Sequence, residues 1–533
     1  GEAEALAGAT VSWKEGFRSA VTDSAGLVVI AGIPSGTQTF SVTHVGYEEA
    51  SVSFVFPLLS DTAIVITLEG EEHEHEEEVV VRATRTSRTI TNTPTRIEVI
   101  SGEELAEKGN MKPGDIRMLL NESTGIQTQQ TSATSYNAGI RIQGLEGRYT
   151  QLLRDGYPLY AGFSGGLSIL QIAPLDLRQV EVIKGSASTL YGGGAIAGLV
   201  NLVSKTPGEE RELNFLANAT SAGGLDLSGF YSEQYGKAGL TVYAARNSTA
   251  PFDPAGIGLT AIPKAERYTI NPRLFLYGNS TTADFGVSYI TEDRIGGNMA
   301  YIKNGGTGFF EENNTDRITT QLGITHRLPN GTSLQLKNSY SLFDRQISIP
   351  AYSFAAKQQS SFSELTWSNN REGAEWIVGA NLLTDNLAEE EVRSVPLRNY
   401  NHTTVGLFVQ NTWTVSEAFT LETGLRGDNV SHYGFELLPR VSALFRVSPA
   451  LTTRIGGGAG YKTPTVFTEE AERIQFQNVF PIDREKTRHE RSVGGNWDIN
   501  YRARLGAIGI SLNHLFFYTR LNRPLVRVGA PGG

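Results

Sequence analysis

Residues 180–205 read VEVIKGSASTLYGGGAIAGLVNLVSK, and this stretch decides the fold. Its two ends have the β-branched, apolar composition of strands. Its middle is made of small residues and includes Gly192, Gly193, Gly194 and Gly198. Glycine lets a backbone turn sharply and approach its neighbours where side chains do not fit. A phosphate loop, a nucleophile loop and a tightly folded plug all use such a stretch, so the rest of the chain must decide among them.

Two enzymatic interpretations of the glycines fail on their context. Gly192-x-Gly194-x-x-Ala197 matches a relaxed dinucleotide fingerprint, but that motif needs a helix after the glycines, and GLVNLVSK has the pattern of a strand. Residues 162–166, GFSGG, match G-x-S-x-G without the preceding buried strand and following helix of a nucleophile elbow. We find no HExxH motif and no P-loop, so we predict that the protein is not an enzyme.

The composition excludes several classes of site and partner. The chain of 533 residues has no cysteine, which rules out disulfides, thiolate zinc sites and cysteine nucleophiles. Its formal charge of −10 argues against nucleic acid as a partner. No stretch approaches the roughly 20 apolar residues of a membrane-spanning helix. A transmembrane barrel remains possible, because its alternating strands average to near-neutral hydropathy.

Residues 1–70 form a first unit with the pattern of a small all-β sandwich. Alternating or β-branched runs predict strands at 9–13, 27–30, 37–42, 50–56 and 63–68. The pattern GATVSWKEG…AVTDSAGLVVIAGIPSGTQTFSVTHVGYEEASV resembles the carboxypeptidase-regulatory-like domain that precedes many outer-membrane receptors of the Bacteroidetes type. The usual first strand of that domain is missing here.

Residues 71–85 form an acidic linker followed by a short apolar segment. The run EGEEHEHEEE at 69–78 should be solvated, because like charges cannot bury themselves together. His73 and His75 are either a weak site for zinc, copper or nickel or incidental members of a spacer. The following VVVRATR is either an edge strand of the next domain or a segment that adds as a strand to a partner's sheet.

Residues 86–207 predict a compact α+β unit. Ser101, with Glu104 three residues on, indicates a capping box for a helix over 101–108. Pro113 begins a second predicted helix, PGDIRMLLNES. Strands are predicted near residues 125–129, 138–143, 150–154, 179–184 and 198–204.

From residue 208 to 533 the pattern changes. Segments of 9–13 residues, in which apolar and polar residues alternate, are connected by short turns on one side and by long polar loops on the other. We count about fifteen such strands, whose length suits a bilayer crossed by tilted strands. Aromatic residues near strand ends, such as Tyr277, Tyr289, Trp413 and Tyr461, are predicted to form interface girdles. A soluble propeller is disfavoured because no blade-length repeat is found.

Four co-linear motifs identify a family. IRIQGLEGRYTQLLRDGYPLY, the stretch at 180–205, GLRGDNVSHYGFELLPRVSALF and TRIGGGAGYKTPTVFTEEA together resemble the TonB-dependent outer-membrane receptors. The one departure is around Gln143, where IRIQG stands in place of IRG. The resemblance implies a mainly β protein: an N-terminal sandwich, an α+β plug at 86–207 and a barrel at 208–533. Plugged transporter barrels have 22 strands, so we expect about six or seven to be missing, and the C-terminally truncated chain to be inactive alone.

The resemblance also assigns roles to residues. The first set, the TonB box, would pair with TonB by strand addition, and it is Glu78, Val79, Val80 and Val81. A second set in the plug apical loops either binds cargo or packs plug against barrel: Arg148, Tyr149, Tyr157, Tyr160 and Phe163. A third set, Arg141, Glu181 and Lys184, is expected to lock plug to barrel, because a charge left buried without its partner costs several kcal/mol.

The implied function is uptake across the outer membrane, with the N-terminal domain and the plug base facing the periplasm. The partners would be TonB with its inner-membrane energising complex, outer-membrane lipid and a small-molecule metal chelate. No covalent cofactor is expected, and the expected cargo is an iron chelate, a ferric siderophore. Uptake of copper, zinc, haem or cobalamin is the alternative within transport. A non-transporting surface signalling or adhesion receptor is the alternative outside it.

Overall fold

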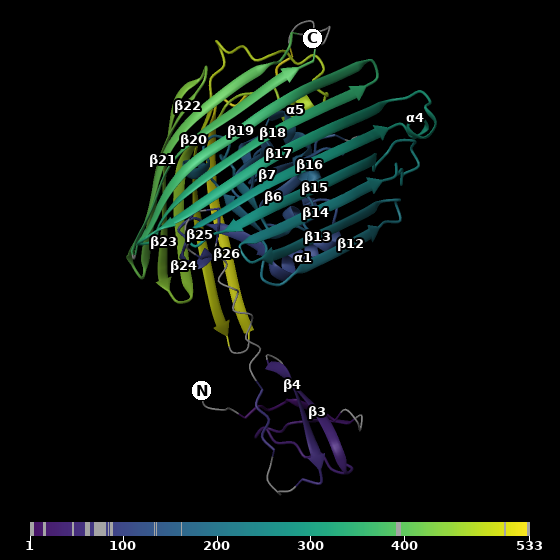
Figure 1. Cartoon of the computed structure of the whole chain (residues 1–533), viewed down its shortest axis with the longest axis vertical. Helices are drawn as coiled ribbons and strands as arrows, with labels where there is room; N and C mark the ends of the chain where they lie inside the picture. The colour runs from purple at the N-terminus through teal and green to yellow at the C-terminus, as the bar shows by residue number, and fades with distance from the viewer. Residues whose placement is uncertain are drawn as a thin grey trace. The chain divides into compact units, whose positions relative to one another are not determined.

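The chain divides into two compact units, Gly1–Val79 and Val80–Gly533. The computed structural model describes residues 5–13, 18–44, 47–58, 64–68, 81–83, 85, 89–132, 134, 136–160, 162–371, 373–390, 396–505 and 508–529. Figure 1 shows the chain from purple at the N-terminus to yellow at the C-terminus. Among the described residues, no helix is long and apolar enough to cross a membrane.

The first unit contains one four-stranded antiparallel sheet in the order β2-β1-β3-β4. Its strands are β1 (Thr10–Trp13), β2 (Arg18–Val21), β3 (Gly36–His44) and β4 (Tyr47–Phe56). The indole of Trp13 is buried and donates to Gln38 Oε1 at 2.9 Å. Strands were also predicted at 27–30 and 63–68, and this prediction is wrong. The described residues 27–30 and 64–68 pack apolar side chains on the core but do not pair with a strand.

The second unit begins with the plug, whose main sheet has five strands in the order β5-β10-β11-β8-β9. They are β5 (Ile97–Ser101), β10 (Leu177–Lys184), β11 (Gly198–Ser204), β8 (Thr150–Arg154) and β9 (Tyr157–Tyr160). The opening stretch of the sequence supplies β10 and β11, which are almost entirely buried. They pair antiparallel, and β11 then pairs parallel with β8. Burial on both faces means that their polar side chains, such as Glu181 and Asn201, must find partners inside the plug.

Short helices and a hairpin complete the plug. The helices are α1 (Gly102–Met111), α2 (Arg117–Asn121), α3 (Ser188–Tyr191), η1 (Ile90–Asn92), η2 (Gly147–Tyr149) and η3 (Gly162–Gln171), and the hairpin is β6 (Ile126–Gln130) with β7 (Ala138–Ile142). Ser101 stands at the N-cap of α1, but the predicted side-chain cap is absent. The residue ends strand β5 instead, where it pairs with Gln179.

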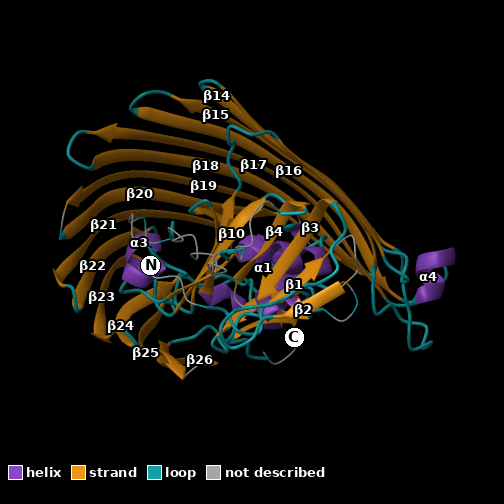
Figure 2. Ribbon diagram, turned by 90° about the horizontal axis from the view of Figure 1, so that it is seen from below, coloured by secondary structure: helices purple, strands orange, loops and turns teal. Residues whose placement is uncertain are grey.

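The rest of the unit is a fifteen-stranded antiparallel sheet in which each strand pairs with the next along the chain, from β12 to β26. Its strands are β12 (Glu212–Ala219), β13 (Leu225–Tyr235), β14 (Ala238–Thr249), β15 (Lys264–Tyr277), β16 (Thr281–Gly297), β17 (Phe310–Leu328), β18 (Thr332–Ile349), β19 (Tyr352–Arg371), β20 (Ala374–Glu389), β21 (Tyr400–Ser416), β22 (Phe419–Val430), β23 (Gly434–Ser448), β24 (Leu451–Lys462), β25 (Glu490–Leu505) and β26 (Ile508–Asn522). The sheet curves around the plug, as Figure 2 shows.

Two faces of this sheet differ in chemistry because successive side chains point to opposite sides. On β21, Leu407 faces outward and is 64% exposed, whereas Phe408 faces the plug and is 3% exposed. Trp376 and Trp413 meet edge to face on the outer side. Tyr461 departs from the predicted girdle: it is 3% exposed and packs against the plug, because its register places it on the inner face.

Most wall strands are longer than the predicted 9–13 residues. Strands β16 to β21 each contain 16–20 residues. They exceed the roughly 9–11 residues that cross a bilayer, so they extend beyond it toward the long loops. Two of these loops carry helices, α4 (Met299–Asn304) between β16 and β17 and α5 (Glu469–Glu472) between β24 and β25.

Candidate functional site at the plug and barrel

The glycine turn at Gly192–Gly194 lies so close to the barrel wall that a side chain on Gly192 or Gly193 would force its neighbours to move. Gly192 has φ +74°, and a Cβ built on it would lie 2.9 Å from Nη2 of Arg426 on β22. A Cβ on Gly193 would lie 2.7 Å from the ring of Tyr461 on β24. The Gly194 N–H donates to the Tyr461 carbonyl at 2.9 Å. The turn therefore presses the plug directly against the barrel wall.

Three of the apical residues predicted to bind cargo, Tyr149, Tyr157 and Phe163, are buried. Tyr149 and Tyr157 are both 2% exposed. The Tyr149 hydroxyl donates to Glu490 at 2.5 Å, and the same carboxylate pairs with Arg148 at 2.9 Å. The Tyr157 hydroxyl donates to the carbonyl of Leu322 on β17 at 2.9 Å. These side chains pack plug against barrel here, so a cargo-binding role for them remains a prediction. Tyr160 ends β9, and its side chain lies outside the described residues.

Phe163, the last of the predicted apical residues, is the centre of an aromatic cluster. It is 1% exposed, and its ring centroid lies 5.3 Å from that of Phe354 on β19. The loop at 463–489 contributes Phe467, at 5.1 Å, and Phe476, at 6.3 Å. The loop between β24 and β25 thus folds inward and covers the plug apex.

The same loop is tied down by its acidic residues. Helix α5 carries Glu469, which pairs with Arg141 of the plug, and Glu472, which pairs with Arg345 of β18 at 2.8 Å. The Arg345 side chain is fully buried. Arg141, predicted to lock the plug, therefore links it to this loop.

The other two charges of the predicted lock have their partners within the plug. Lys184 pairs with Glu98 on the neighbouring strand β5 and donates to the Thr124 carbonyl. Glu181 accepts from Asn201 of β11 at 2.9 Å. Burial raises the pKa of the Glu181 carboxyl, and the hydrogen bonds that it accepts oppose the rise.

Glu181 also accepts two hydrogen bonds from the chain that enters the plug. The backbone N–H groups of Arg82 and Ala83 each donate to its carboxylate at 2.7 Å. Val81 is fully buried in the cluster that includes Ile183 and Leu199. The preceding Glu78, Val79 and Val80, with His73 and His75, lie outside the described residues.

Arg85 connects the chain that enters the plug to the barrel wall. Its guanidinium lies 2.8 Å from Glu364 of β19, and both side chains are buried. It also covers the rings of Tyr191 and Phe408. We name residues 81–85 the entry segment. The sequence did not predict the pair of Arg85 and Glu364, because the position of β19 relative to the plug is decided only by the tertiary structure.

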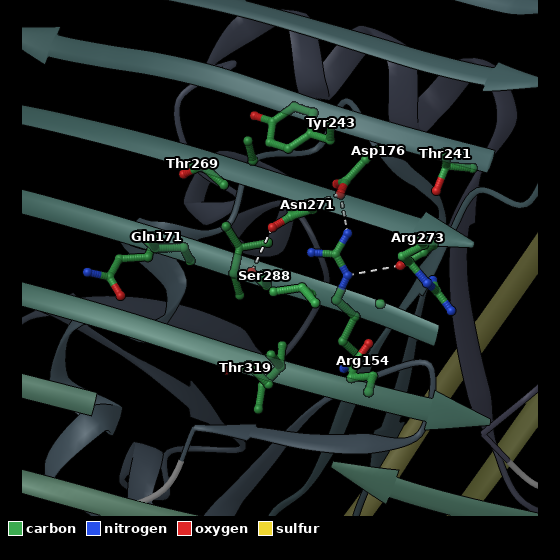
Figure 3. Close-up of a pocket in the computed structure, with 18 of the residues that line it drawn as sticks. Arg154, Gln171, Asp176, Thr241, Tyr243, Thr269, Asn271, Arg273, Ser288 and Thr319 are labelled. Carbon is green, nitrogen blue, oxygen red and sulfur yellow. Dashed lines mark hydrogen bonds and ion pairs between the residues drawn. The ribbon is translucent and has the colours of Figure 1, made fainter. Parts of the chain in front are cut away.

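A cavity of about 50 Å³, lined by both polar and apolar residues, lies between plug and wall along β13–β17. Figure 3 shows Arg154 of the plug beside Asp176, with Asn271 and Ser288 of the wall close by. Arg273 of β15 reaches the plug's Asp155 at 2.7 Å. Ion pairs lower the pKa of Asp155 although its burial opposes this. Charged and polar groups thus join plug and wall along these strands.

Family models match three parts of the chain. The TonB-dependent receptor plug domain matches residues 89–199, and the TonB-dependent receptor-like β-barrel matches residues 258–472. The CarboxypepD_reg-like domain matches residues 1–81. These matches follow the order of the units described above.

Curated relatives include receptors and transporters. The iron-regulated outer membrane virulence protein of Vibrio cholerae is 24% identical over 411 residues, covering 72% of this chain and 60% of the relative. The vitamin B12 transporter BtuB of the same species is 20% identical, covering 78% and 67%. The ferrioxamine B receptor of Salmonella typhimurium is 25% identical, covering 48% and 38%. The chain spans about 60% of the length of the first of these relatives.

Solved structures share the fold. The siderophore receptor PirA from Acinetobacter baumannii superposes with a TM-score of 0.65 at 15% identity, covering 80% of this chain and 70% of that one. A mutant ferric enterobactin receptor from Pseudomonas aeruginosa, in complex with enterobactin, has a TM-score of 0.65 at 16% identity, covering 81% and 72%. At these identities the likeness shows the fold alone.

Proposed function

Because the chain belongs to the TonB-dependent receptors of the outer membrane, we propose that it imports a scarce metal chelate, and that this chelate is a ferric siderophore. The relatives named as ferrioxamine B and ferric aerobactin receptors support iron as the cargo metal. TonB, energised by its inner-membrane complex, is the proposed partner. It would pair with the TonB box, Glu78 to Val81, by strand addition in the periplasm.

One observation carries the proposal: the entry segment is held in the core of the plug. Glu181, which accepts from the backbone of residues 82 and 83, lies in the middle of β10. A partner that pulls on residues 78–81 would therefore act on a central plug strand and not on a loose tail. Breaking these charge-assisted bonds removes two donors from a buried carboxylate and leaves it the side chains of Gln179 and Asn201, which is unfavourable. This would favour rearrangement of β10 and its neighbours.

The polar contact between plug and wall suits such a rearrangement. Ion pairs such as Arg273 with Asp155 and Arg148 with Glu490 join the two parts. Water can replace polar contacts of this kind at little enthalpic loss, whereas an apolar core has no such substitute. The proposed cycle is therefore capture of the chelate outside, pairing with TonB inside, displacement of part of the plug, and passage.

The experiment is uptake of radiolabelled ferric siderophores by iron-starved cells that depend on this receptor. Val80→Pro is compared with Val80→Ala, because proline removes a backbone donor and disrupts strand pairing whereas alanine keeps it. We expect Val80→Pro to bind the chelate at the surface and to import none, and Val80→Ala to do both. Normal import by Val80→Pro would refute the assignment of the TonB box.

The choice of cargo is tested in the same cells. Copper, zinc, haem and cobalamin are offered in turn, each at the same concentration. Import of one of these, without import of any ferric siderophore, would replace the iron assignment. Surface binding without import of any cargo would instead favour a signalling or adhesion receptor.

A further inference from the structure

We propose that the lipid-facing end of strand β13 binds the headgroup of a phospholipid that carries a primary ammonium group. The site is formed by Tyr231, Glu233 and Tyr235, which we name the β13 triad. It lies on the outer surface of the wall, away from the plug and from the residues predicted to bind cargo or TonB. The inference therefore does not depend on what the receptor imports.

The three side chains of the β13 triad form one compact polar group. They occupy alternate positions of β13 and so point to the same side of the sheet. Both tyrosine hydroxyls donate to Oε2 of Glu233, at 2.5 Å from Tyr231 and at 2.7 Å from Tyr235. Oε1 of Glu233 accepts no hydrogen bond from any residue that the structure describes. The carboxylate is thus held between two tyrosines with one oxygen free.

The β13 triad faces away from the plug. The alternate residues of the same strand, Phe230 and Ser232, point inward and are each 2% exposed. Tyr235 is 57% exposed, and Tyr231 and Glu233 are partly exposed. Strand β13 is the second of the wall (Figure 1) and pairs with β12 and β14 on its two sides. The triad is therefore part of the lipid-facing surface and not of an unpaired sheet edge.

Apolar side chains adjoin the triad on this surface. In the antiparallel register, Leu213 of β12 is the partner of Tyr231, and Leu240 of β14 is the partner of Glu233. Leu213 is 51% exposed, so the apolar surface continues up to the triad. The triad itself lies where β13 ends, next to the short turn at Gly236. This is the position of a headgroup interface, where aromatic side chains with a polar tip are favoured.

The carboxylate of Glu233 needs a cation that the described part of the chain does not supply. No lysine or arginine in that part forms an ion pair with it. A carboxylate beside an apolar surface attracts a cation more strongly than one in bulk water, because the local dielectric constant is lower. The two phenol rings add to this attraction, since ammonium groups bind against the faces of aromatic rings. A carboxylate flanked by two aromatic rings therefore suits an ammonium group.

Two cations nearby would serve the phosphate of the same lipid. Lys237 lies in the turn after the triad, and Arg211 directly precedes β12, which pairs with β13. Neither cation forms an ion pair with another described residue. Glu209 and Glu210 come just before Arg211 and disfavour a headgroup of net negative charge. The set therefore fits a zwitterionic headgroup with one ammonium and one phosphate, as in phosphatidylethanolamine.

The test is lipid binding by the purified full chain in detergent, measured by native mass spectrometry. The probes are phosphatidylethanolamine and phosphatidylglycerol with the same acyl chains. We expect the first bound phosphatidylethanolamine to be held about tenfold more tightly than phosphatidylglycerol. Glu233→Gln should abolish this preference, whereas Glu417→Gln, which changes an exposed carboxylate in the turn between β21 and β22, should keep it. Equal affinity of the unmodified receptor for both lipids, or an unchanged preference in Glu233→Gln, would overturn the proposal.

The aromatic part of the site has a separate test. Tyr235→Leu removes the ring and the hydroxyl, whereas Tyr235→Phe removes the hydroxyl alone. We expect Tyr235→Leu to weaken binding of phosphatidylethanolamine by about threefold and Tyr235→Phe by less than about twofold, because the ring face holds the ammonium group. Tyr235 lies on the outer surface, so both variants should fold. Equal losses in the two variants would contradict an ammonium site built on the tyrosine rings.

Discussion

The guanidinium of Arg85 lies 2.8 Å from the carboxylate of Glu364, and this pair joins the entry segment of the plug to strand β19 of the wall. The side chains are 8% and 1% exposed. Thr95 and Arg440 make a second such link near the plug base, where the hydroxyl of Thr95 donates to Glu422 at 2.8 Å. The beginning of the plug is therefore fixed to the barrel by polar contacts at several strands.

Removing one partner of the Arg85–Glu364 pair should destabilise the docked plug. Glu364→Gln leaves a buried guanidinium without its counter-charge, which is expected to lower the free energy of unfolding by about 3–5 kcal/mol. Replacing both residues with methionine should recover most of this loss, because an apolar pair of similar volume avoids the desolvation penalty. Denaturant titration of the purified receptor measures both effects. A double variant as unstable as Glu364→Gln would contradict this account.

Stability should depend on the protonation of Glu181. Its pKa is raised in the folded protein, so the native state binds this proton more tightly than the unfolded chain does. The resulting contribution to stability is complete below the unfolded pKa of about 4.3 and is lost as the pH rises through the folded value. The difference in unfolding free energy between the unmodified receptor and Glu181→Gln, followed against pH, isolates this component. A difference that stays constant across that window would show that Glu181 titrates as in the unfolded chain.

The seat of the glycine turn should not tolerate a methyl group. Gly193→Ala would bring a Cβ to 2.7 Å from the Tyr461 ring, and overpacking of this kind costs typically about 1–3 kcal/mol. Gly165→Ala is the matched control, because nothing lies within 4 Å of the added atom. We expect a lower thermal midpoint for Gly193→Ala alone. Equal midpoints for the two variants would mean that the turn shifts freely.

The loop that covers the plug apex should open when its aromatic anchor is removed. Phe467 packs against Phe163 and is 7% exposed, so Phe467→Ala should remove about 3–5 kcal/mol of packing. Phe480 of the same loop is 55% exposed and serves as the control. Limited proteolysis of intact cells should cut the loop at 463–489 faster in Phe467→Ala than in Phe480→Ala. Identical cleavage rates would contradict the anchoring role.

The sequence predicted most helices and strands of the plug, but it did not predict which side chains contact each other. The segments at 179–184 and 198–204 gave β10 and β11, because valine, isoleucine and leucine recur in both. A helix was expected over 101–108 and is found over 102–111, without the predicted side-chain cap. Strand β9 and helix η3 were missed, because YPLYAGFSGG carries no periodic pattern. The sequence did not decide whether Glu181 and Lys184 pair within the plug or with the wall, and their side-chain partners Asn201 and Glu98 belong to the plug.

The sequence by itself determined the order of the parts, their strand content and the family, since these follow from residue types and spacing along the chain. The tertiary structure decided which charges meet. Arg85 and Glu364 are 279 residues apart, and only the stagger of β19 against the plug brings them together. The same holds for the glycine turn, which meets Arg426 and Tyr461 only because the plug folds against the wall. The sequence determines the chemistry of each side chain, but the position of the sheet relative to the plug determines which side chains come into contact.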